Sequence, residues 1–580
     1  MVPYILTTAV IHCMMPVMMK QIKNPALRRM REILDEKYFY KPEYFDGRTQ
    51  FILLGGDNSD VGQNALCFEV YPGAPFCLFV ATASNPPKKI RDKALSHALA
   101  TETIGIVAFF SHDNEYFEVL RRRYRDDKFE TVHGVEYYYK GSAGGEFRLF
   151  EEGAEYQAPT NAQAVNLIPI TNKLENIFFE IHSAMRDIDG LHADAALEEL
   201  CKLLYLKSYL EEQESILPIS RITTSSFGTV EEYASCLRAL YREAINYDLR
   251  VFRLKIPEYE RSRGVFDLPI FLSSSALVKS FQLIEEFSLT RSDTDLKGRA
   301  FQKVLGKSVR SGMGQYFTPV QVCQLMVEIT APTSSELILD PFCGSGHFLT
   351  ESLSYVRHTA PDHTKEYHEF AFGKLHGIEK SDRMTRIAMT DMRLNGDGHS
   401  NIRCTDALLD FRNYPDLKPE SFDLVLTNPP FGSILGIEAF SGLARFSLAE
   451  GRKKVPLEIV GLERSIEFLR PGGRIAIVLP ESIFNAESLK YVREWLMSKL
   501  AIRIVIDLPN ETFAPFGANV RSGILFGRKR RAGEDFPKNK KACMIRVDNL
   551  GYDAAGRETK GSEIAEAIKT AKRFLQKEGW

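Results

Sequence analysis

The segment at 340–346 reads Asp-Pro-Phe-Cys-Gly-Ser-Gly and directly follows the apolar residues Leu337, Ile338 and Leu339. This order predicts a buried strand that leads into a glycine turn and then into a helix beginning near His347. Glycines let the backbone approach a ligand closely, and the first amides of the following helix point toward the same place. The segment is therefore typical of a nucleotide pocket in an α/β fold.

A second predicted strand ends in a proline-rich turn. Residues 422–426 read Phe-Asp-Leu-Val-Leu and are followed at 427–431 by Thr-Asn-Pro-Pro-Phe. In an open α/β sheet, ligands bind beyond the carboxyl ends of the strands. We therefore expect this turn and the glycine turn to face one crevice.

Two further predicted strands end in an acidic residue. The strand at 374–378 precedes Glu379, and the strand at 402–405 precedes Asp406 and Ala407. A carboxylate at such a strand end can accept hydrogen bonds from the ribose hydroxyls of a nucleoside, and another can accept from its adenine amine. Glu379 lies further from Gly346 than the roughly 20 residues of a dinucleotide fold, and an insertion at 359–372 accounts for the excess. Each acid alone is more often a cap or a surface charge, but together they favour one nucleoside pocket.

The chain has 580 residues, which is too long for one hydrophobic core and indicates several domains. Its composition, 44% apolar and 26% charged, is that of an ordinary soluble protein. The net charge of -2 means that any nucleic-acid contact must use a local basic face or a second subunit. The nine cysteines are scattered without a C-x-x-C pair, which indicates neither disulfides nor a zinc site and fits a reducing cytoplasm.

The apolar stretch at 4–19 is not expected to be a signal segment, because His12 and Pro16 interrupt it and no basic region precedes it. We interpret it as part of the fold or as sequence upstream of the real start. No other stretch approaches the length that spans a bilayer, so no membrane contact is expected.

The predicted elements divide the chain into four regions. Residues 1–150 alternate apolar strands with one helix near 90–100 and form a small α/β module. Residues 160–305 are helical, and one of their helices places leucines inside and Glu198, Glu199 and Lys202 outside. The α/β domain with the pocket occupies 306–535 and includes a helix, a turn at 470–473 and later strands at 474–480, 502–508 and 522–526.

The last region, 536–580, combines a basic segment with a helix at 562–577. Apolar residues recur along one side of this helix, at Ile564, Ile568, Ala571 and Phe574. This stripe favours a docking helix over a free tail. Near the other end of the α/β domain, Pro319 suits the first turn of a helix, with Thr318 as its N-cap.

The turn at 428–431 fits a specific chemistry. The exocyclic amine of adenine is a poor nucleophile because its lone pair is delocalised into the ring. The side-chain oxygen of Asn428 and the carbonyl of Pro429 could accept its two N–H bonds and direct the lone pair toward an electrophile. Pro430 stiffens the turn, and Phe431 offers a face on which an extruded base can stack. NAD or ATP is disfavoured, because the sequence lacks the phosphate loop of ATPases and 340–346 is not G-x-G-x-x-G.

Three segments outside the pocket resemble the modification subunits of type I restriction-modification systems. The hexapeptide Gly-Gln-Tyr-Phe-Thr-Pro at 314–319 is similar to a signature of their adenine methyltransferases, and the segments 195–207 and 295–301 are similar to their helical region. The segment 513–519 resembles the late hairpin of the same domain. The resemblance implies a Rossmann-like S-adenosylmethionine-dependent methyltransferase domain, preceded by an α-helical domain and a small α/β module.

The resemblance also implies a reaction and a set of residues. The protein would be a cytoplasmic, site-specific enzyme of phage defence that transfers a methyl group from S-adenosylmethionine to N6 of adenine in double-stranded DNA. Thr318 would bind the methionine carboxylate, Glu379 the cofactor ribose and Asp406 its adenine. The expected cofactor-binding residues are Gln315, Tyr316, Phe317, Thr318, Asp340, Pro341, Gly344, Ser345, Gly346, Glu379, Asp406 and Ala407, the catalytic ones are Asn428, Pro429, Pro430 and Phe431, and no metal is expected.

Two other functions fit parts of the pattern. N4-cytosine relatives usually carry Ser where this chain has Asn428, which favours adenine. Protein glutamine methyltransferases and some ribosomal RNA methyltransferases share the residues at 428–431 but lack the hexapeptide at 314–319. A cofactor-binding scaffold in a defence complex is a further alternative, and the intact turn at 428–431 argues against it.

The first 150 residues resemble the nuclease-like domain of restriction subunits. The matching strand, Val80 to Ser84, lacks the metal-binding Asp and Glu-x-Lys of that domain, so we expect an inactive or structural module. The basic run at 121–125 could contact phosphates, although a solvated helix face is the commoner explanation.

Single-polypeptide relatives append a large target-recognition domain, but few residues follow Lys541 here. We therefore expect a separate specificity subunit, contacted in part by the helical region or the final helix. A restriction subunit is a further expected partner, and the isolated chain is expected to methylate little.

Overall fold

The computed structural model describes most of the chain, apart from several segments in its first half and a few later loops. The described residues are 25–33, 50–53, 65–71, 74–84, 86–100, 106–113, 116–123, 128–131, 139–140, 146–147, 168–169, 174–216, 227–251, 268–289, 297–298, 300–301, 303–304, 317–359, 364–395, 401–436, 441–516, 520–534 and 541–578. The apolar start at 4–19 and the residues Gln315 and Tyr316 lie outside them.

The chain divides into two compact units that differ from the regions expected from the sequence. One contains Met1–Thr171, Lys202–Leu254 and Pro269–Ser292, and the other contains Asn172–Cys201, Lys255–Leu268 and Asp293–Trp580. The division passes through helix α6 (Ala193–Ile216). The helical region expected at 160–305 is therefore shared between the two units.

The first unit contains the α/β module predicted for 1–150. Its sheet has the order β1 (Gln50–Leu53), β2 (Ala65–Tyr71), β3 (Ala74–Thr82), β4 (Ile106–Ser111), β5 (Tyr116–Arg123) and β6 (Lys128–Thr131). Only the β3–β4 pair is parallel, and helix α4 (Lys88–Ala100) connects these two strands. The buried side chains of Leu78, Val80, Val107 and Phe109 form the core between α4 and the sheet.

The remaining elements of this unit are helical or very short. They are α2 (Pro25–Ile33), β7 (Tyr139–Lys140), β8 (Glu146–Phe147), β9 (Ile168–Pro169), α7 (Val230–Val251), α9 (Ser274–Gln282) and β10 (Phe287–Ser288). The prediction that the basic run lies on a helix face is wrong, because Arg121, Arg122 and Arg123 belong to strand β5. Tyr124 and Arg125 lie outside the described residues.

The charged residues of α6 do not lie outside the bundle as the helical pattern predicts. Glu199 and Lys202 are only 4% and 3% exposed. The ammonium group of Lys202 donates to the carbonyl of Pro269 at 2.8 Å, and Glu198 pairs with Arg386 at 2.5 Å. Burial is tolerated here because the charged groups have partners, which a pattern of apolar spacing does not reveal.

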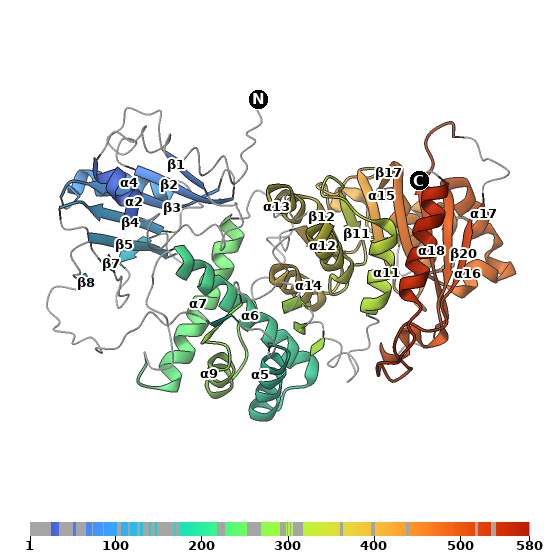
Figure 1. Ribbon diagram of the computed structural model, residues 1–580, viewed down its shortest axis with the longest axis horizontal. Helices are drawn as coiled ribbons and strands as arrows, with labels where there is room; N and C mark the ends of the chain where they lie inside the picture. Colours follow the sequence, from blue (N-terminus) through green and yellow to red (C-terminus); the bar gives the residue numbers. More distant parts are fainter. Residues whose placement is uncertain are drawn as a thin grey trace. The chain divides into compact units, whose positions relative to one another are not determined.

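The second unit is built on an eight-stranded sheet (Figure 1). Its order is β13 (Ile402–Cys404), β12 (Leu375–Glu379), β11 (Ile338–Asp340), β14 (Phe422–Thr427), β17 (Leu469–Pro480), β19 (Ser522–Lys529), β18 (Leu500–Asp507) and β20 (Cys543–Arg546). The first five strands are parallel, and β19 runs antiparallel to both neighbours. The order reverses between β11 and β14, which is the place where such sheets bind ligands.

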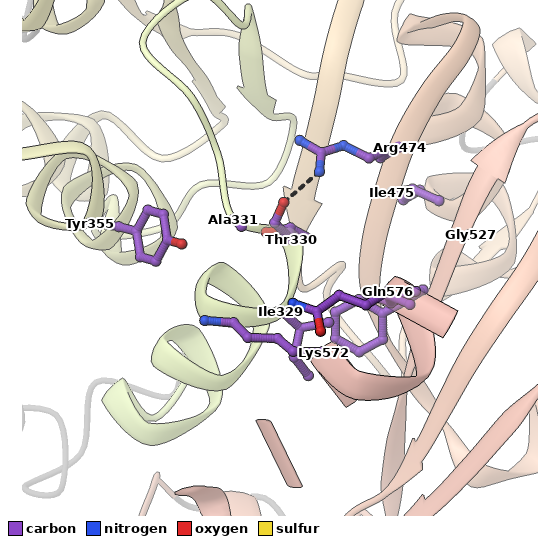
Figure 2. Close-up of a pocket in the computed structure, with 11 residues that line it drawn as sticks. Ile329, Thr330, Ala331, Tyr355, Arg474, Ile475, Gly527, Lys572 and Gln576 are labelled. Carbon is purple, nitrogen blue, oxygen red and sulfur yellow. Dashed lines mark hydrogen bonds between the residues drawn. The ribbon is translucent and has the colours of Figure 1, made fainter. Parts of the chain in front are cut away.

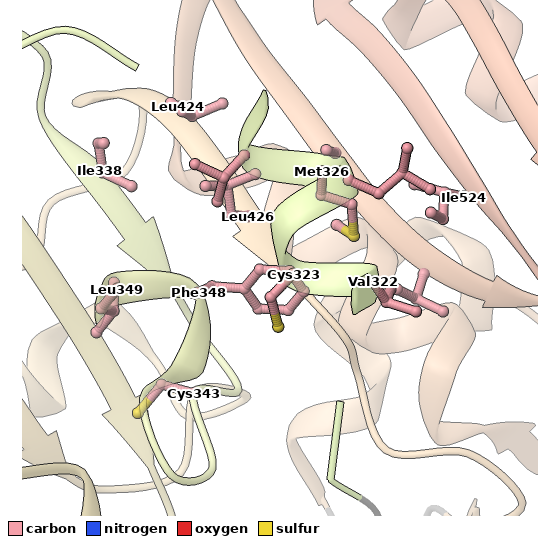
Figure 3. Close-up of a cluster of buried hydrophobic side chains, with 14 of the residues drawn as sticks. Val322, Cys323, Met326, Ile338, Cys343, Phe348, Leu349, Leu424, Leu426 and Ile524 are labelled. Atoms are coloured by element: carbon pink, nitrogen blue, oxygen red, sulfur yellow. The ribbon is translucent and has the colours of Figure 1, made fainter. Parts of the chain in front are cut away.

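Consecutive residues of the central strands point into two different cores. Ile338, Leu424 and Leu426 belong to one core, while Leu339 and Val425 belong to the other. Helices α11 (Val320–Thr330) and α12 (His347–Thr359) pack on the first core, as Figure 3 shows. Helices α15 (Leu457–Phe468) and α17 (Lys490–Lys499) pack on the second. Helices on both faces of a mostly parallel sheet make this the Rossmann-like sandwich expected from the sequence.

The other elements of this unit surround the sheet. They are α5 (Leu174–Asp189), α13 (Thr364–Gly373), α14 (Asp382–Leu394), β15 (Ile434–Gly436), β16 (Lys454–Pro456), α16 (Glu481–Asn485), α18 (Ile564–Lys577) and the short 3-10 helices Phe411–Asn413, Ser441–Arg445, Ser447–Ala449, Glu487–Leu489 and Asn510–Phe516. Within the described ranges, each helix is too short or too polar to cross a bilayer.

The turn predicted at 470–473 is an irregularity inside β17 rather than a break before it. Phe422 of β14 pairs with Leu469, whereas Leu424 pairs with Arg474, so the register shifts across these residues. Gly472 has a φ of 86°, a conformation that glycine adopts without strain. The strand therefore continues on either side of the turn.

The C-terminal region completes the α/β domain instead of standing apart from it. Strand β20 pairs with β18 at the edge of the sheet, and α18 packs against α11. Ala567 and Ala571 are buried, and the predicted stripe packs on the first core. This contact makes α18 a docking helix, but its apolar stripe docks on this same domain and is covered there.

A cavity of about 330 Å³ lies where α18 meets the sheet and α11 (Figure 2). Its polar lining residues include Tyr355, Arg474, Lys572 and Gln576. The guanidinium of Arg474 donates to the carbonyl of Thr330 and pairs with Glu336 at 2.7 Å. The cavity is lined by none of the site residues predicted from the sequence.

The docking of α18 predicts a specific sensitivity to charge. Ala571 is fully buried, so Ala571→Asp would place a carboxylate in the core without a partner. We expect the free energy of unfolding to fall by roughly 3 kcal/mol. The same change at the exposed Ala565 of this helix is the matched control and should leave stability nearly unchanged. Urea unfolding followed by circular dichroism measures both, and equal stabilities of the two variants would contradict the docking.

Candidate active site

The glycine turn after β11 has the conformation expected of a ligand-binding loop. Gly344 and Gly346 have φ values of 52° and 85°, which side chains other than glycine rarely adopt. A Cβ atom on Gly344 would have no heavy atom of the described structure within 4 Å, so open space adjoins the turn. A Cβ on Gly346 would lie 3.4 Å from the Cβ of Ala388, so this glycine permits close packing of α12 on α14.

A buried hydrogen bond joins the glycine turn to the proline-rich turn. The hydroxyl of Thr427 donates to Oδ1 of Asp340 at 2.6 Å, and the amide of Phe342 donates to the same oxygen at 3.1 Å. Asp340 is 1% exposed, and its burial raises its pKa to about 7, helped by the nearby charge of Glu379. The two turns therefore lie side by side, as the sequence predicts.

Asn428 is oriented by Thr318. The amide nitrogen of Asn428 donates to the hydroxyl of Thr318 at 3.0 Å, while its side-chain oxygen is buried and accepts no hydrogen bond from the described residues. The prediction that Thr318 caps helix α11 is wrong, because Pro319 occupies the cap position and no side chain caps the helix. The hydroxyl has a tertiary partner instead.

Phe431 of the proline-rich turn is less exposed than a residue that stacks on an extruded base should be. Pro429 is buried and Pro430 is exposed. Phe431 is only 7% exposed, and its ring packs edge-on against Phe513 with the centroids 6.0 Å apart. In this structure Phe431 is therefore part of the core and does not present an open face to a base.

Helix α15 packs against the proline-rich turn, a contact that the sequence analysis did not predict. The amide of Leu457 donates to the carbonyl of Ser433 at 2.8 Å, and the carboxylate of Glu458 accepts from the amide of Gly432. A Cβ on Gly461 would lie 3.1 Å from the Cβ of Pro429, so helix and turn are in close contact. A glycine inside a helical pattern was the available signal.

Glu458 itself is a buried acid beside the turn. It is 9% exposed, and this burial raises its pKa. Its Oε2 atom has no hydrogen-bond partner in the part of the chain that the structure describes.

The two acids at the neighbouring strand ends already hold backbone and side-chain donors. Oε2 of Glu379 accepts from the amide of Gly344 at 3.0 Å, and Oε1 accepts from Ser381 at 2.7 Å. Burial raises the pKa of Glu379. Asp406 pairs through Oδ2 with Lys380 at 2.9 Å, a lysine that the sequence analysis did not consider.

His347, the first residue of α12, is a further group that the sequence analysis missed. Burial lowers its pKa to about 4, so the imidazole is neutral near pH 7. Its Nδ1 lies 3.2 Å from the carbonyl of Thr318 and donates to it, which leaves Nε2 as an acceptor. Nε2 is buried without a partner among the described residues. Phe317 packs edge-on against the imidazole at 6.4 Å.

The remaining predicted site residues lie in or beside the two turns and strand ends described above. Ser345 and Ala407 are 4% and 3% exposed, and Pro341 lies between Asp340 and Phe342 in the turn. The described residues contain no group of three or more His, Cys, Asp or Glu side chains that could hold a metal ion.

The strand order and the site together define a class of protein. A sheet that reverses between β11 and β14, with a glycine turn and an acid at the end of the next strand, is the fold of S-adenosylmethionine-dependent methyltransferases of class I. Residues 292–579 match the family described as N-6 DNA Methylase, and this part of the chain belongs to it. It is an adenine-specific, S-adenosylmethionine-dependent DNA methyltransferase domain, as the sequence predicts.

Similar proteins support this assignment. The chain is 27% identical over 380 residues to the type I restriction enzyme EcoEI methylase subunit of Escherichia coli, covering 61% of this chain and 75% of that protein. It is 28% identical over 260 residues to the EcoKI methylase subunit of Escherichia coli strain K12, covering 42% of this chain and 46% of that protein. It thus spans less than half the length of the second relative.

A solved structure shares the fold. A chain from work on complex assembly and conformational transition of the type I R-M system matches with a TM-score of 0.52 and 21% identity, over 70% of this chain and 83% of that one. The family match begins at residue 292, so the nuclease-like character of the first 150 residues stays a prediction.

The raised pKa of Asp340 predicts a pH-dependent stability. Its folded pKa of about 7 lies above the unfolded value of 3.8, so the stability it contributes is complete below pH 3.8 and is lost as the pH rises through 7. Asp340→Asn removes this titration and keeps an oxygen for the hydroxyl of Thr427. Between pH 5 and 7 we expect wild type to lose up to about 1.4 kcal/mol per pH unit relative to the variant.

Urea unfolding at several pH values measures this difference. Asp553→Asn is the control, because the amide of Arg557 lowers the pKa of this partly exposed acid and it stays ionised throughout the range. Parallel stability profiles for wild type and Asp340→Asn would show that Asp340 is ionised in the folded protein.

Proposed function

We propose that this chain is the modification subunit of a type I restriction-modification system and methylates N6 of adenine at specific sites in double-stranded DNA. The observation that carries the proposal is the arrangement of Asn428. Its amide nitrogen is held by Thr318, and its oxygen is buried with no donor from the described chain. A buried acceptor without a donor costs about 1 to 3 kcal/mol, so its presence calls for a ligand that supplies the donor.

The adenine amine supplies such donors. One N–H would be accepted by the side-chain oxygen of Asn428 and the other by the carbonyl of Pro429. This pairing would fix the nitrogen and direct its lone pair away from the ring plane. Pro430 would restrict the turn, and a base could stack on Phe431 only after Phe431 becomes more exposed than its present 7%.

The residues around the glycine turn fit the cofactor. Bound S-adenosylmethionine supplies an electrophilic methyl group next to a nucleophile. Open space adjoins Gly344. The carboxylate of Glu379 accepts from the amides of Gly344, Ser381 and Lys380, and its remaining acceptor capacity can take a ribose hydroxyl. Asp406 would accept from the cofactor adenine, and Thr318 would contact its methionine end together with Gln315, Tyr316 and Phe317.

The family match favours DNA over the alternative substrates. A protein glutamine or RNA methyltransferase would share the turn at 428–431 but not membership of the N-6 DNA Methylase family. Incubation with tritiated S-adenosylmethionine and a mixture of host macromolecules separates these functions, because only the substrate becomes labelled.

We infer the partners of the protein from its relatives. A separate specificity subunit would choose the DNA sequence, and a restriction subunit would complete the system in the cytoplasm. Because α18 packs on its own domain, the helical elements are the better candidates for the subunit contact. The first unit would be structural, since Val80, Ala81 and Thr82 of β3 offer no carboxylate for a nuclease metal.

Replacement of Asn428 tests the proposed reaction directly. Asn428→Ala removes the acceptor oxygen, so methylated adenines should disappear from host DNA in a strain that carries only the variant. Sequencing of modified bases with and without the variant measures this loss. Unchanged S-adenosylmethionine binding by the purified variant serves as the folding control. Persistent methylation at the same sites would contradict the assigned role of Asn428.

The contact between Thr318 and Asn428 gives a second test. Thr318→Val removes the acceptor that orients the amide, whereas Thr318→Ser retains a hydroxyl. We expect kcat of methyl transfer to fall by about tenfold or more for Val and by much less for Ser, because the lost hydrogen bond is worth about 1 to 3 kcal/mol. Equal rates for Val and Ser in a tritium-transfer assay of the complex would show that the hydroxyl does not orient Asn428.

A further inference from the structure

We propose that the two-stranded ribbon formed by β15 and β16 contacts the DNA duplex beside the extruded adenine. Lys453 and Lys454 would bind backbone phosphates, and Ile434 would fill the space that the adenine leaves. This inference rests on the proposed function and assigns residues for handling DNA that the pocket does not include.

The ribbon is a direct continuation of the proline-rich turn. Strand β15 begins at Ile434, three residues after Phe431, and β16 runs into α15. The two strands are antiparallel, with Ile434 opposite Pro456 and Gly436 opposite Lys454. The bond from the amide of Leu457 to the carbonyl of Ser433 closes the base of the ribbon. A base that reaches Asn428 must therefore leave its duplex close to this ribbon.

The ribbon carries positive charge that no described acidic side chain pairs with. Arg452, Lys453 and Lys454 are all exposed. The ammonium groups of Lys453 and Lys454 make no hydrogen bond or ion pair within the described part of the chain. The guanidinium of Arg452 stacks on the ring of Tyr491 at 3.8 Å. Within residues 450–454 the three basic residues outnumber the single acid, Glu450, which is also exposed. The whole chain has a net charge of -2, so this excess is local.

The spacing along the ribbon matches a nucleic-acid backbone. Lys454 lies opposite Gly436, two residues beyond Ile434. A strand rises about 3.3 Å per residue, so the lysine is roughly 7 Å further along the ribbon than the isoleucine. This distance is about two steps of stacked base pairs. A lysine there can therefore reach a phosphate near the extruded base while Ile434 is at the base itself.

Ile434 is an apolar residue whose side chain is exposed to solvent, which is energetically unfavourable. Its side chain is 66% exposed, although the residue sits on a strand and is apolar. A β-branched side chain has few rotamers, so it is a stiff group on a fixed backbone. Proteins that unstack or extrude bases commonly insert such a wedge into the gap. An apolar wedge flanked by lysines fits a DNA duplex better than an acidic or purely apolar protein surface.

The lysines are tested through the salt dependence of DNA binding. The modification complex is purified in three forms: with the wild-type chain, with the double variant Lys453→Ala/Lys454→Ala, and with the double variant Lys560→Ala/Lys577→Ala. The last form is the control, because Lys560 and Lys577 are exposed lysines elsewhere in the same domain. Anisotropy of a labelled duplex is measured over a range of salt concentrations. The slope of log K against log salt should decrease in magnitude by about 2 for the ribbon variant, roughly one per lysine, and remain unchanged for the control.

Ile434 is tested through the cost of extruding the base. Single-turnover methylation is compared on a duplex with a normally paired target adenine and on one with the adenine mispaired, which is easier to extrude. Ile434→Ala should slow the paired substrate by about tenfold and the mispaired one by less than about twofold. Met544→Ala, which truncates an apolar side chain that is 72% exposed on β20, should change neither rate.

The outcomes separate this inference from the proposed function. If the wild-type complex methylates DNA but both ribbon variants behave like their controls, the ribbon does not contact DNA. If a variant loses a subunit from the complex during gel filtration, the ribbon is a protein interface and the inference is also wrong. If the wild-type complex labels no DNA at all but labels RNA or protein, the proposed function fails instead.

Discussion

The hydrogen bond between Thr427 and Asp340 fixes the geometry on which the site depends. It joins the ends of β11 and β14, the two strands between which the order of the sheet reverses. Beyond β11 the chain enters the glycine turn and α12, and beyond β14 it enters the proline-rich turn backed by α15. The backbone pairing of β11 with β14 sets their register, and this buried bond fixes the two turns against each other at the ends of the strands. In the proposed reaction, this bond would also set the distance between the cofactor and the extruded base.

The sequence predicted the features of this site whose signals are local. An apolar run before Asp340, glycines at 344 and 346 and the turn at 428–431 each specify their own backbone. Thr318 shows where such rules stop. A threonine before a helical proline satisfies the local rule for a cap, yet its hydroxyl bonds to a side chain 110 residues away in the sequence. A local rule cannot anticipate a competing partner that only folding brings near.

Tertiary pairing also explains the other differences between sequence and structure. Lys202 looks like a solvent-facing position of a helix, but it is buried with its ammonium group on the carbonyl of Pro269. The support of the proline-rich turn by α15 has the same origin. Gly461 is small because Pro429 packs against it, and nothing within the helix itself requires a glycine there. Periodicity predicts which elements exist, and packing decides what their polar residues do.

Three buried acceptors beside the two turns lack donors within the described chain. The side-chain oxygen of Asn428, Oε2 of Glu458 and Nε2 of His347 are all buried without partners in the described chain. Thr318 orients two of these groups, since its hydroxyl binds the amide nitrogen of Asn428 and its carbonyl binds Nδ1 of His347. Fixed dipoles of this kind cost stability in the free protein but need no reorganisation when a ligand binds. Acceptors held in place select a ligand group that donates, so in the proposed reaction this site would favour the N6 amine of adenine over the O4 carbonyl oxygen that thymine presents.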